Sequence, residues 1–122
     1  MYTSGVWIVR KGRGSRDMRP TFAGLQPWAI PYAQFLYEVA ELNQLRPRIT
    51  SVFRTSQQQA VLYQRFLRGL SSLPAAPPGR SLHEKGLAWD MVTDNPPALG
   101  ALWKSMGGRW FPSDPVHFEV PG

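Results

Sequence analysis

The chain has 122 residues, enough for one domain with a single hydrophobic core, and 43% of its residues are apolar. A formal net charge of +6 favours polyanionic partners, while the absence of cysteine excludes disulfides and thiolate metal sites. No apolar run is long enough for a transmembrane helix or a signal peptide, so we expect a chain that is made in the cytoplasm without an export signal.

The first part of the chain, residues 1–27, is predicted to be an irregular basic lead-in to a core over residues 28–122, the whole forming one domain. It contains one predicted short strand at residues 6–10. Five of the fourteen basic residues lie close together here: Arg10, Lys11, Arg13, Arg16 and Arg19. Such a cluster is most often a solvated arm, and the functional alternatives are binding to nucleic acid or to an anionic cell envelope.

A helix is predicted over residues 31–43, because proline suits a first turn and apolar residues follow at helical spacing. Those residues are Tyr32, Phe35, Leu36, Val39 and Leu42. A strand is expected over residues 48–54, with Phe53 on the same side as Ile49 and Ser51. A second helix should begin at Thr55 or Ser56, each followed by a glutamine three residues later, as in a capping box. Its apolar face is predicted to be Ala60, Leu62, Tyr63, Phe66 and Leu67, and Gly69 is the expected end.

Residues 71–80 are rich in proline, alanine and glycine and are predicted to form a loop. A strand over residues 86–93, a helix from residue 96 to Gly107 and a last strand over residues 116–120 complete the prediction. The residues of that helix expected to face inward are Leu99, Leu102, Trp103 and Met106. Helices and short strands alternate without a regular βαβ order, which favours the α+β class.

The only two histidines lie in motifs that also contain carboxylates. One motif runs from Ser81 through His83 to Asp90, and the other is Asp114-Pro115-Val116-His117-Phe118-Glu119. Two histidines and one carboxylate are a common ligand set for a catalytic zinc that keeps one position open. If the strands carrying Asp90 and His117 are neighbours, then His83, Asp90 and His117 converge on one point, because alternate residues of a strand share a face.

Asp114 and Arg54 would complete a hydrolytic site, the first as a proton-accepting base and the second as a donor to an oxyanion. Each residue also has an ordinary interpretation: Arg54 as a surface or salt-bridging residue, Asp114 as a turn residue and Ser81 as a loop cap. Glu119 could ligate a metal, orient a histidine or face solvent. The joint occurrence of these residues favours a metal site over the separate interpretations.

Three ordered blocks of the sequence resemble one family of zinc enzymes. The blocks are Ser-x-His-x6-Asp with Gly86 and Ala88 inside it, Asp-x-x-His-Phe-Glu, and a Ser-x-x-Arg segment that leads into Gln-x-x-Leu-Tyr over residues 51–63. They are similar to the zinc D-Ala-D-Ala carboxypeptidase and L-alanyl-D-glutamate endopeptidase family of peptidoglycan peptidases. The resemblance implies the hedgehog/DD-peptidase fold, a small antiparallel sheet packed against two or three helices.

By this resemblance, His83, Asp90 and His117 match the zinc ligands and Asp114 matches the catalytic base. Arg54 matches the arginine that binds substrate or stabilises the transition state, and Ser81 matches a substrate-side hydroxyl. Several members have glutamate where this chain has Asp114 and tryptophan where it has Val116. The shorter acid is typical of phage-type endopeptidases, whereas residues 78–81 are as similar to the carboxypeptidases, so the resemblance leaves both modes of cleavage open.

The sequence thus predicts a monomeric zinc peptidase that cuts an amide bond in the peptidoglycan stem peptide. We expect phage or prophage origin, action on the cell wall after release by lysis machinery or from a virion, and attraction of the basic surface to anionic envelope polymers. The first alternative is a catalytically inactive metal-binding module of the same fold. The second, a nucleic-acid binder, rests only on the arginine cluster, and no specific nucleic-acid partner is expected.

Overall fold

The computed structural model describes residues 21–121. In this range the elements are the 3-10 helices η1 (Pro27–Ala29) and η2 (Leu82–Lys85), the helices α1 (Ile30–Leu42), α2 (Ser56–Leu67) and α3 (Pro96–Ser105), and the strands β1 (Arg48–Ser51), β2 (Ala88–Val92), β3 (Arg109–Trp110) and β4 (His117–Glu119). The predicted strand at residues 6–10 and the arginine cluster lie outside the described residues. None of the described helices is long and apolar enough to cross a membrane.

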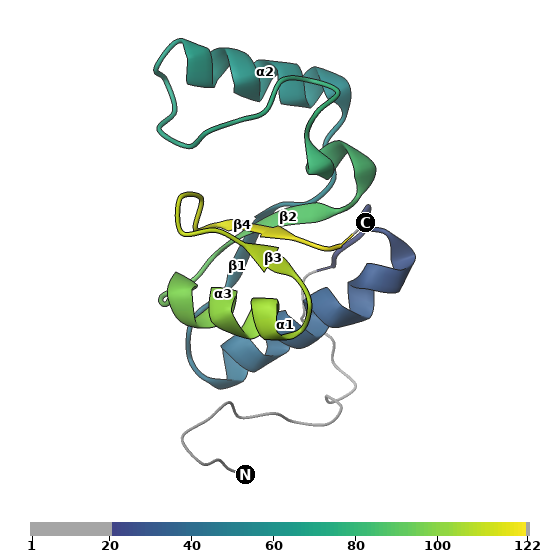
Figure 1. Cartoon of the computed structure of the whole chain (residues 1–122), viewed down its shortest axis with the longest axis vertical. Coiled ribbons are helices and arrows are strands. Elements are labelled where there is room, and N and C mark those ends of the chain that lie inside the picture. The colour runs from purple at the N-terminus through teal and green to yellow at the C-terminus, as the bar shows by residue number, and fades with distance from the viewer. Residues whose placement is uncertain (1–20, 122) are drawn as a thin grey trace.

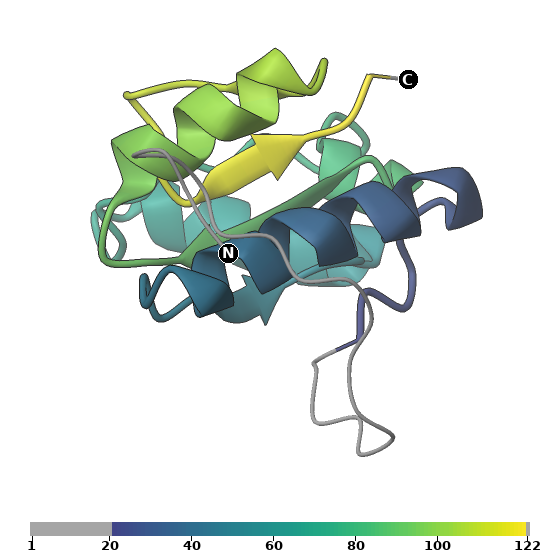
Figure 2. The same ribbon diagram turned by 90° about the horizontal axis from the view of Figure 1, so that it is seen from below.

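The four strands form one antiparallel sheet in the order β1-β2-β4-β3. Helices α1 and α3 cover one face of this sheet, and α2 lies on the opposite side, away from both (Figure 1). The view from below shows the same arrangement, with α1 and α3 in front of the strands and α2 behind them (Figure 2). The predicted α+β class and the small antiparallel sheet with three helices are therefore confirmed.

The core lies between the sheet and the α1–α3 layer and is centred on Trp89, which is fully buried. Its ring stacks on Phe118 at 5.5 Å and meets Phe22 and Trp103 edge-on at 5.5 and 5.1 Å, geometries that aromatic pairs favour. Because side chains alternate along a strand, the burial of Trp89 and Met91 in this core turns Asp90 to the opposite face. The core thus fixes the face on which the polar residue lies.

The predicted inner face of α1 is partly wrong. Tyr32 and Phe35 are 55% and 39% exposed, and the buried residues include Ala33 and Ala40 as well as Leu36 and Val39. Ala33 and Ala40 lie on the same helical stripe as Leu36, whereas Tyr32 and Phe35 each come one position before a buried residue, so their rings turn away from that stripe towards solvent.

The predicted start of α2 is confirmed, because Thr55 and Gln58 form a reciprocal capping box. Its predicted apolar face is wrong at Phe66 and Leu67, which are exposed, whereas Ala60, Leu62 and Tyr63 are half-buried and Gln59 is the one buried residue of this helix. The reason is that α2 does not pack on the aromatic core but stands across a cleft from the sheet.

The remaining predicted elements agree with the structure except at their ends. The strand predicted over residues 48–54 ends at Ser51, after an irregularity in its pairing with β2, so Phe53 lies beyond the strand, where it is exposed. The helix predicted from residue 96 is α3, with Asn95 as its cap and Leu99 and Trp103 buried. The sequence did not predict η2 or the two-residue strand β3.

Candidate active site

His83 is held at the end of the loop over residues 71–80 by local hydrogen bonds of η2. The Ser81 hydroxyl accepts the His83 backbone N–H at 3.2 Å, and Glu84 accepts the Ser81 N–H, which closes a capping box. Gly86 then ends the short helix in the left-handed conformation, at φ +69, where a side chain would be strained. The chain turns back into β2, and the His83 side chain is 2% exposed.

Asp90 and His117 face each other across the central strand pair. They are Cα partners in the antiparallel pairing of β2 with β4, and both side chains are mostly shielded from solvent. His83 Nε2 and His117 Nδ1 lie 3.1 and 3.3 Å from the same carboxylate oxygen, Asp90 Oδ1. The structure therefore brings together the three residues that the sequence placed around one point, with donor atoms within 4.8 Å of one another.

In each imidazole the outer nitrogen, the one that points away from Asp90, already contacts a hydrogen-bond acceptor. His83 Nδ1 lies 2.7 Å from the Val52 carbonyl oxygen, and His117 Nε2 lies 2.9 Å from Glu119 Oε2. A carbonyl and a carboxylate only accept hydrogen bonds, so both outer nitrogens carry protons. In the neutral histidines the lone pairs of His83 Nε2 and His117 Nδ1 then face Asp90 Oδ1, an arrangement that requires a proton or a metal ion among them.

The separations of both imidazole nitrogens from Asp90 Oδ1 fit a zinc ion. Tetrahedral bonds of about 2.0–2.2 Å keep neighbouring donor atoms about 3.3–3.6 Å apart, close to the two separations from Asp90 Oδ1. Hydrogen bonds from the outer imidazole nitrogens are the usual way in which ligating histidines are oriented. His83, Asp90 and His117 could therefore hold a metal ion, with one coordination position left for another ligand.

Arg54 contacts the other oxygen of the same aspartate. Its Nη2 donates to Asp90 Oδ2 at 2.6 Å, while Nη1 donates to Gln59 and Nε to Ser51, each at 3.0 Å. Its side chain is only 14% exposed, so the guanidinium is fixed by three partners. The arginine predicted as an oxyanion donor thus lies directly beside the candidate metal ligands.

Charges within the site shift the pKa values of its acids and bases. Burial raises the pKa of Asp90, but hydrogen bonds from His117 and His83 in their protonated forms, and the positive charges of His83 and Arg54, outweigh burial and hold it well below its usual range. Burial lowers the pKa of His117, but its bonds to Asp90 and Glu119 raise it overall. Asp90 is therefore ionised at neutral pH, as a metal ligand must be.

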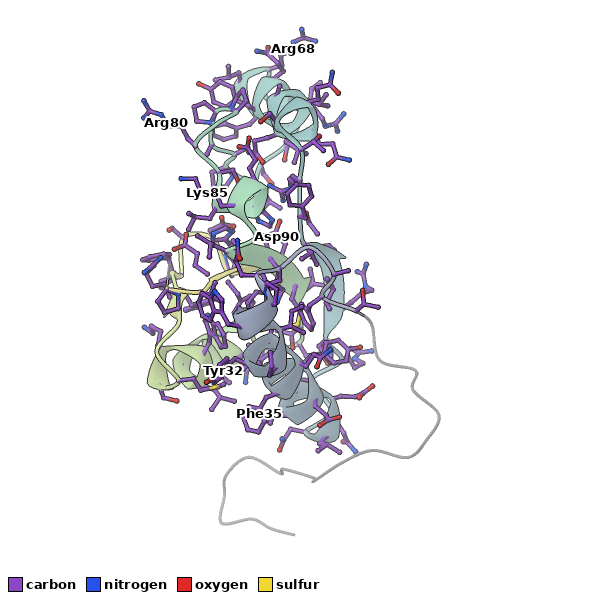
Figure 3. The ribbon with its side chains drawn as sticks, turned by 90° about the vertical axis from the view of Figure 1, so that its right-hand side faces the viewer. Tyr32, Phe35, Arg68, Arg80, Lys85 and Asp90 are labelled. Carbon is purple, nitrogen blue, oxygen red and sulfur yellow. The ribbon has the colours of Figure 1, made fainter. Side chains whose placement is uncertain are left out.

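A cleft of about 700 Å³ opens over these residues, between the sheet on one side and α2 with the following loop on the other. Asp114 and Ser81 both line it, together with Arg54 and the three candidate ligands. Burial is the main cause that raises the pKa of Asp114 above its ordinary value. In Figure 3, Asp90 lies at the level of the sheet, Lys85 lies between that level and α2, and Arg80 projects outward at the height of α2.

Two polar residues that sequence reasoning missed support this site. Gln59 accepts from Arg54 and donates to the Ala76 carbonyl at 2.8 Å, which ties α2 to the loop. Glu84 accepts hydrogen bonds from the Ser56 hydroxyl and from the Gly79 and Ser81 amides. The sequence pointed to Gln59 as the glutamine of the Gln-x-x-Leu-Tyr motif and as a candidate capping residue, but not as a partner of Arg54.

One family model matches most of the chain. Residues 23–110 match the family model described as "VanY: D-alanyl-D-alanine carboxypeptidase", a range that includes Arg54, His83 and Asp90 and ends before Asp114 and His117. A search of the curated proteins found no match.

Several solved structures share the fold at about one fifth sequence identity. A mutant of the vancomycin resistance D,D-pentapeptidase VanY in complex with Zn(II) has a TM-score of 0.66 at 21% identity, covering 95% of this chain and 80% of that chain. The LdcB LD-carboxypeptidase has a TM-score of 0.64 at 21% identity, with 81% and 66% covered. DacB from Streptococcus pneumoniae has a TM-score of 0.63 at 20% identity, with 82% and 68% covered.

Proposed function

Because the chain belongs to the VanY family of D-alanyl-D-alanine carboxypeptidases, we propose that it is a zinc-dependent peptidase that hydrolyses an amide bond in the stem peptide of peptidoglycan. The observation that carries this proposal is the convergence of His83 Nε2, His117 Nδ1 and Asp90 Oδ1 in the cleft. A fold hosts many chemistries, so the function is argued from this donor set rather than from the fold. The Zn(II) in the VanY structure supports zinc as the metal.

The roles of the chain's own residues follow from their places around the metal ligands. When bound, zinc would supply a Lewis acid that polarises a carbonyl and lowers the pKa of water, so that the water loses a proton more readily and becomes a stronger nucleophile. Asp114 accepts the proton that the attacking water loses and delivers it to the amine as the C–N bond breaks. The raised pKa of Asp114 suits both transfers, since a base of higher pKa holds the proton more readily.

Arg54 and Ser81 are proposed to act on the substrate. The Arg54 guanidinium lines the cleft beside Asp90, where it can stabilise the negative charge that develops on the carbonyl oxygen. Ser81 lines the same cleft, and its hydroxyl can donate to a substrate carboxylate while still accepting the His83 N–H. Substitution Asp114→Ala tests the base: hydrolysis should be lost while about one equivalent of zinc stays bound.

The family description and the D-alanine-D-alanine bound in a VanYB structure support D-Ala-D-Ala as the scissile unit, with L-Ala-D-Glu as the second candidate. Mass spectrometry of purified muropeptides after digestion distinguishes them. Carboxypeptidase action removes one D-alanine, whereas endopeptidase action separates L-alanine from the rest of the stem. A wild-type chain that binds zinc but cleaves neither would be a metal-binding module instead of an enzyme.

We further propose a wall-lytic enzyme of phage or prophage origin, acting as a monomer of one domain on the cell wall. The aspartate at position 114, which is typical of phage-type endopeptidases, supports the origin. The net charge of +6 supports attraction to anionic envelope polymers, and exposed Arg65, Arg68, Arg80 and Lys85 contribute to it. Hydrolysis of stem peptides in intact cell walls should fall as ionic strength rises, and salt-insensitive hydrolysis would contradict this attraction.

A further inference from the structure

Glu119 shares the cleft face of β4 with His117. The two residues are separated by one position on the strand, so both side chains point away from Phe118, which is buried in the core. Glu119 Oε2 lies 2.9 Å from His117 Nε2, on the side of the ring opposite the nitrogen that faces Asp90. The Glu119 carboxylate therefore contacts the ring nitrogen of His117 that lies farther from the candidate metal ligands Asp90 and His83.

Arg109 fixes Glu119 in turn from the neighbouring strand. The two residues are cross-strand partners in the pairing of β3 with β4, and Arg109 Nε donates to Glu119 Oε1 at 2.9 Å. The same guanidinium donates through Nη2 to the Val120 carbonyl at 3.4 Å. One carboxylate oxygen is thus held by Arg109 and the other is left for His117, so the carboxylate cannot rotate without losing both contacts.

We propose that Glu119, held by Arg109, is a positioning residue for His117. It keeps the proton on Nε2 and the ring plane fixed, so that the Nδ1 lone pair points at the metal beside Asp90 and His83. This assignment rests on the proposed function, because it requires a metal at the three ligands. The converging ligand atoms belong to His83, Asp90 and His117 and not to Glu119, so Glu119 is assigned to orienting His117 and not to binding the metal.

Zinc affinity and the state of the His117 ring test the proposal. Equilibrium competition between the chain and a chelator should show zinc binding about 10–100-fold weaker in Glu119→Ala than in wild type. Glu119→Gln should lose less, because its amide oxygen still accepts from His117 Nε2–H. Nitrogen NMR of the zinc-loaded chain should show opposite tautomers for its two histidines, Nδ1–H for His83 and Nε2–H for His117.

A matched control is Asp94→Ala, which breaks the exposed Arg46–Asp94 pair, another arginine–carboxylate contact at 2.8 Å. It should bind zinc like the wild type. Arg109→Gln, which leaves Glu119 in place, should weaken zinc binding by a smaller factor than Glu119→Ala. Equal zinc affinity of wild type and all the Glu119 variants would overturn this inference alone. A zinc-loaded His117 with its proton on Nδ1 would overturn it together with the assignment of Nδ1 as a ligand atom. A wild-type chain that binds no zinc would overturn the proposed function and this inference with it.

Discussion

The buried side chain of Gln59 joins α2, the loop after it and the candidate site, and its removal should loosen all three. Gln59 is 1% exposed, accepts from Arg54 at 3.0 Å and donates to the Ala76 carbonyl at 2.8 Å. The substitution Gln59→Ala deletes both hydrogen bonds and leaves Arg54 with two of its three partners.

The size of the effect follows from the types of the two bonds. A hydrogen bond to a charged group contributes about 1.5–3 kcal/mol and a neutral one about 0.5–1.5 kcal/mol. Since Ala76 is only half-buried, water can partly replace its bond, and we expect a loss of about 2–4 kcal/mol in the free energy of unfolding. With about 2.1 cal/mol/K of unfolding entropy per residue, this lowers the melting temperature of a 122-residue chain by about 8–16 °C.

Urea unfolding of Gln59→Ala and Gln57→Ala provides the assay. Gln57 is an exposed residue of the same helix, so the second variant carries the same change in helix propensity without the buried bonds. The zinc-loaded Gln59→Ala chain should also have a lower kcat, since Arg54 is less firmly held. If the two variants unfold within about 0.5 kcal/mol of each other, the usual effect of a surface change, the reasoning is refuted.

Three further changes test other parts of the structure. Gly86→Ala should destabilise the chain more than Gly79→Ala in urea unfolding. Both glycines have positive φ, but only at position 86 would a Cβ meet a backbone oxygen, Gly24 O at 2.6 Å. Equal losses of unfolding free energy in the two variants would contradict this. Asp114→Asn should lower kcat by about 10²–10⁴-fold with zinc content unchanged, and a fall in zinc content instead would make Asp114 a ligand. The pKa of Glu84 is lowered in the folded chain, chiefly by its hydrogen bond from Ser56, so ionised Glu84 stabilises the fold above pH 4.5 and this stabilisation is lost as the pH falls through the lower folded-state pKa. The difference in unfolding free energy between wild type and Glu84→Gln, measured without metal, should therefore shrink as the pH falls over that range.

The ligand triad could be predicted from the sequence because its geometry depends on short-range patterns. The period of two along a strand decides the face of Asp90, and the burial of Trp89 and Met91 settles which face is the core. The convergence with His117 then needed only one strand pairing, β2 with β4, which the structure contains.

The parts that sequence reasoning missed depend on what an element packs against. Helical spacing identified a stripe on α2 but could not show that this helix borders a cleft, so Phe66 was expected inside and Gln59 was overlooked. The contact of Arg109 with Glu119 needs β3, a strand of two residues that is too short to leave a periodic signal. The contacts that support the site therefore depend on pairing between segments distant in the sequence, which local sequence patterns do not reveal.

The central claim is metal-dependent hydrolysis of the stem peptide at His83, Asp90 and His117. The most direct measurement is mass spectrometry of purified muropeptides digested by the wild-type chain, by the chain after complete chelation and by the chelated chain resupplied with zinc. We predict shortened stem peptides in the first and third samples and intact ones in the second. Cleavage that persists after full metal removal would contradict the account.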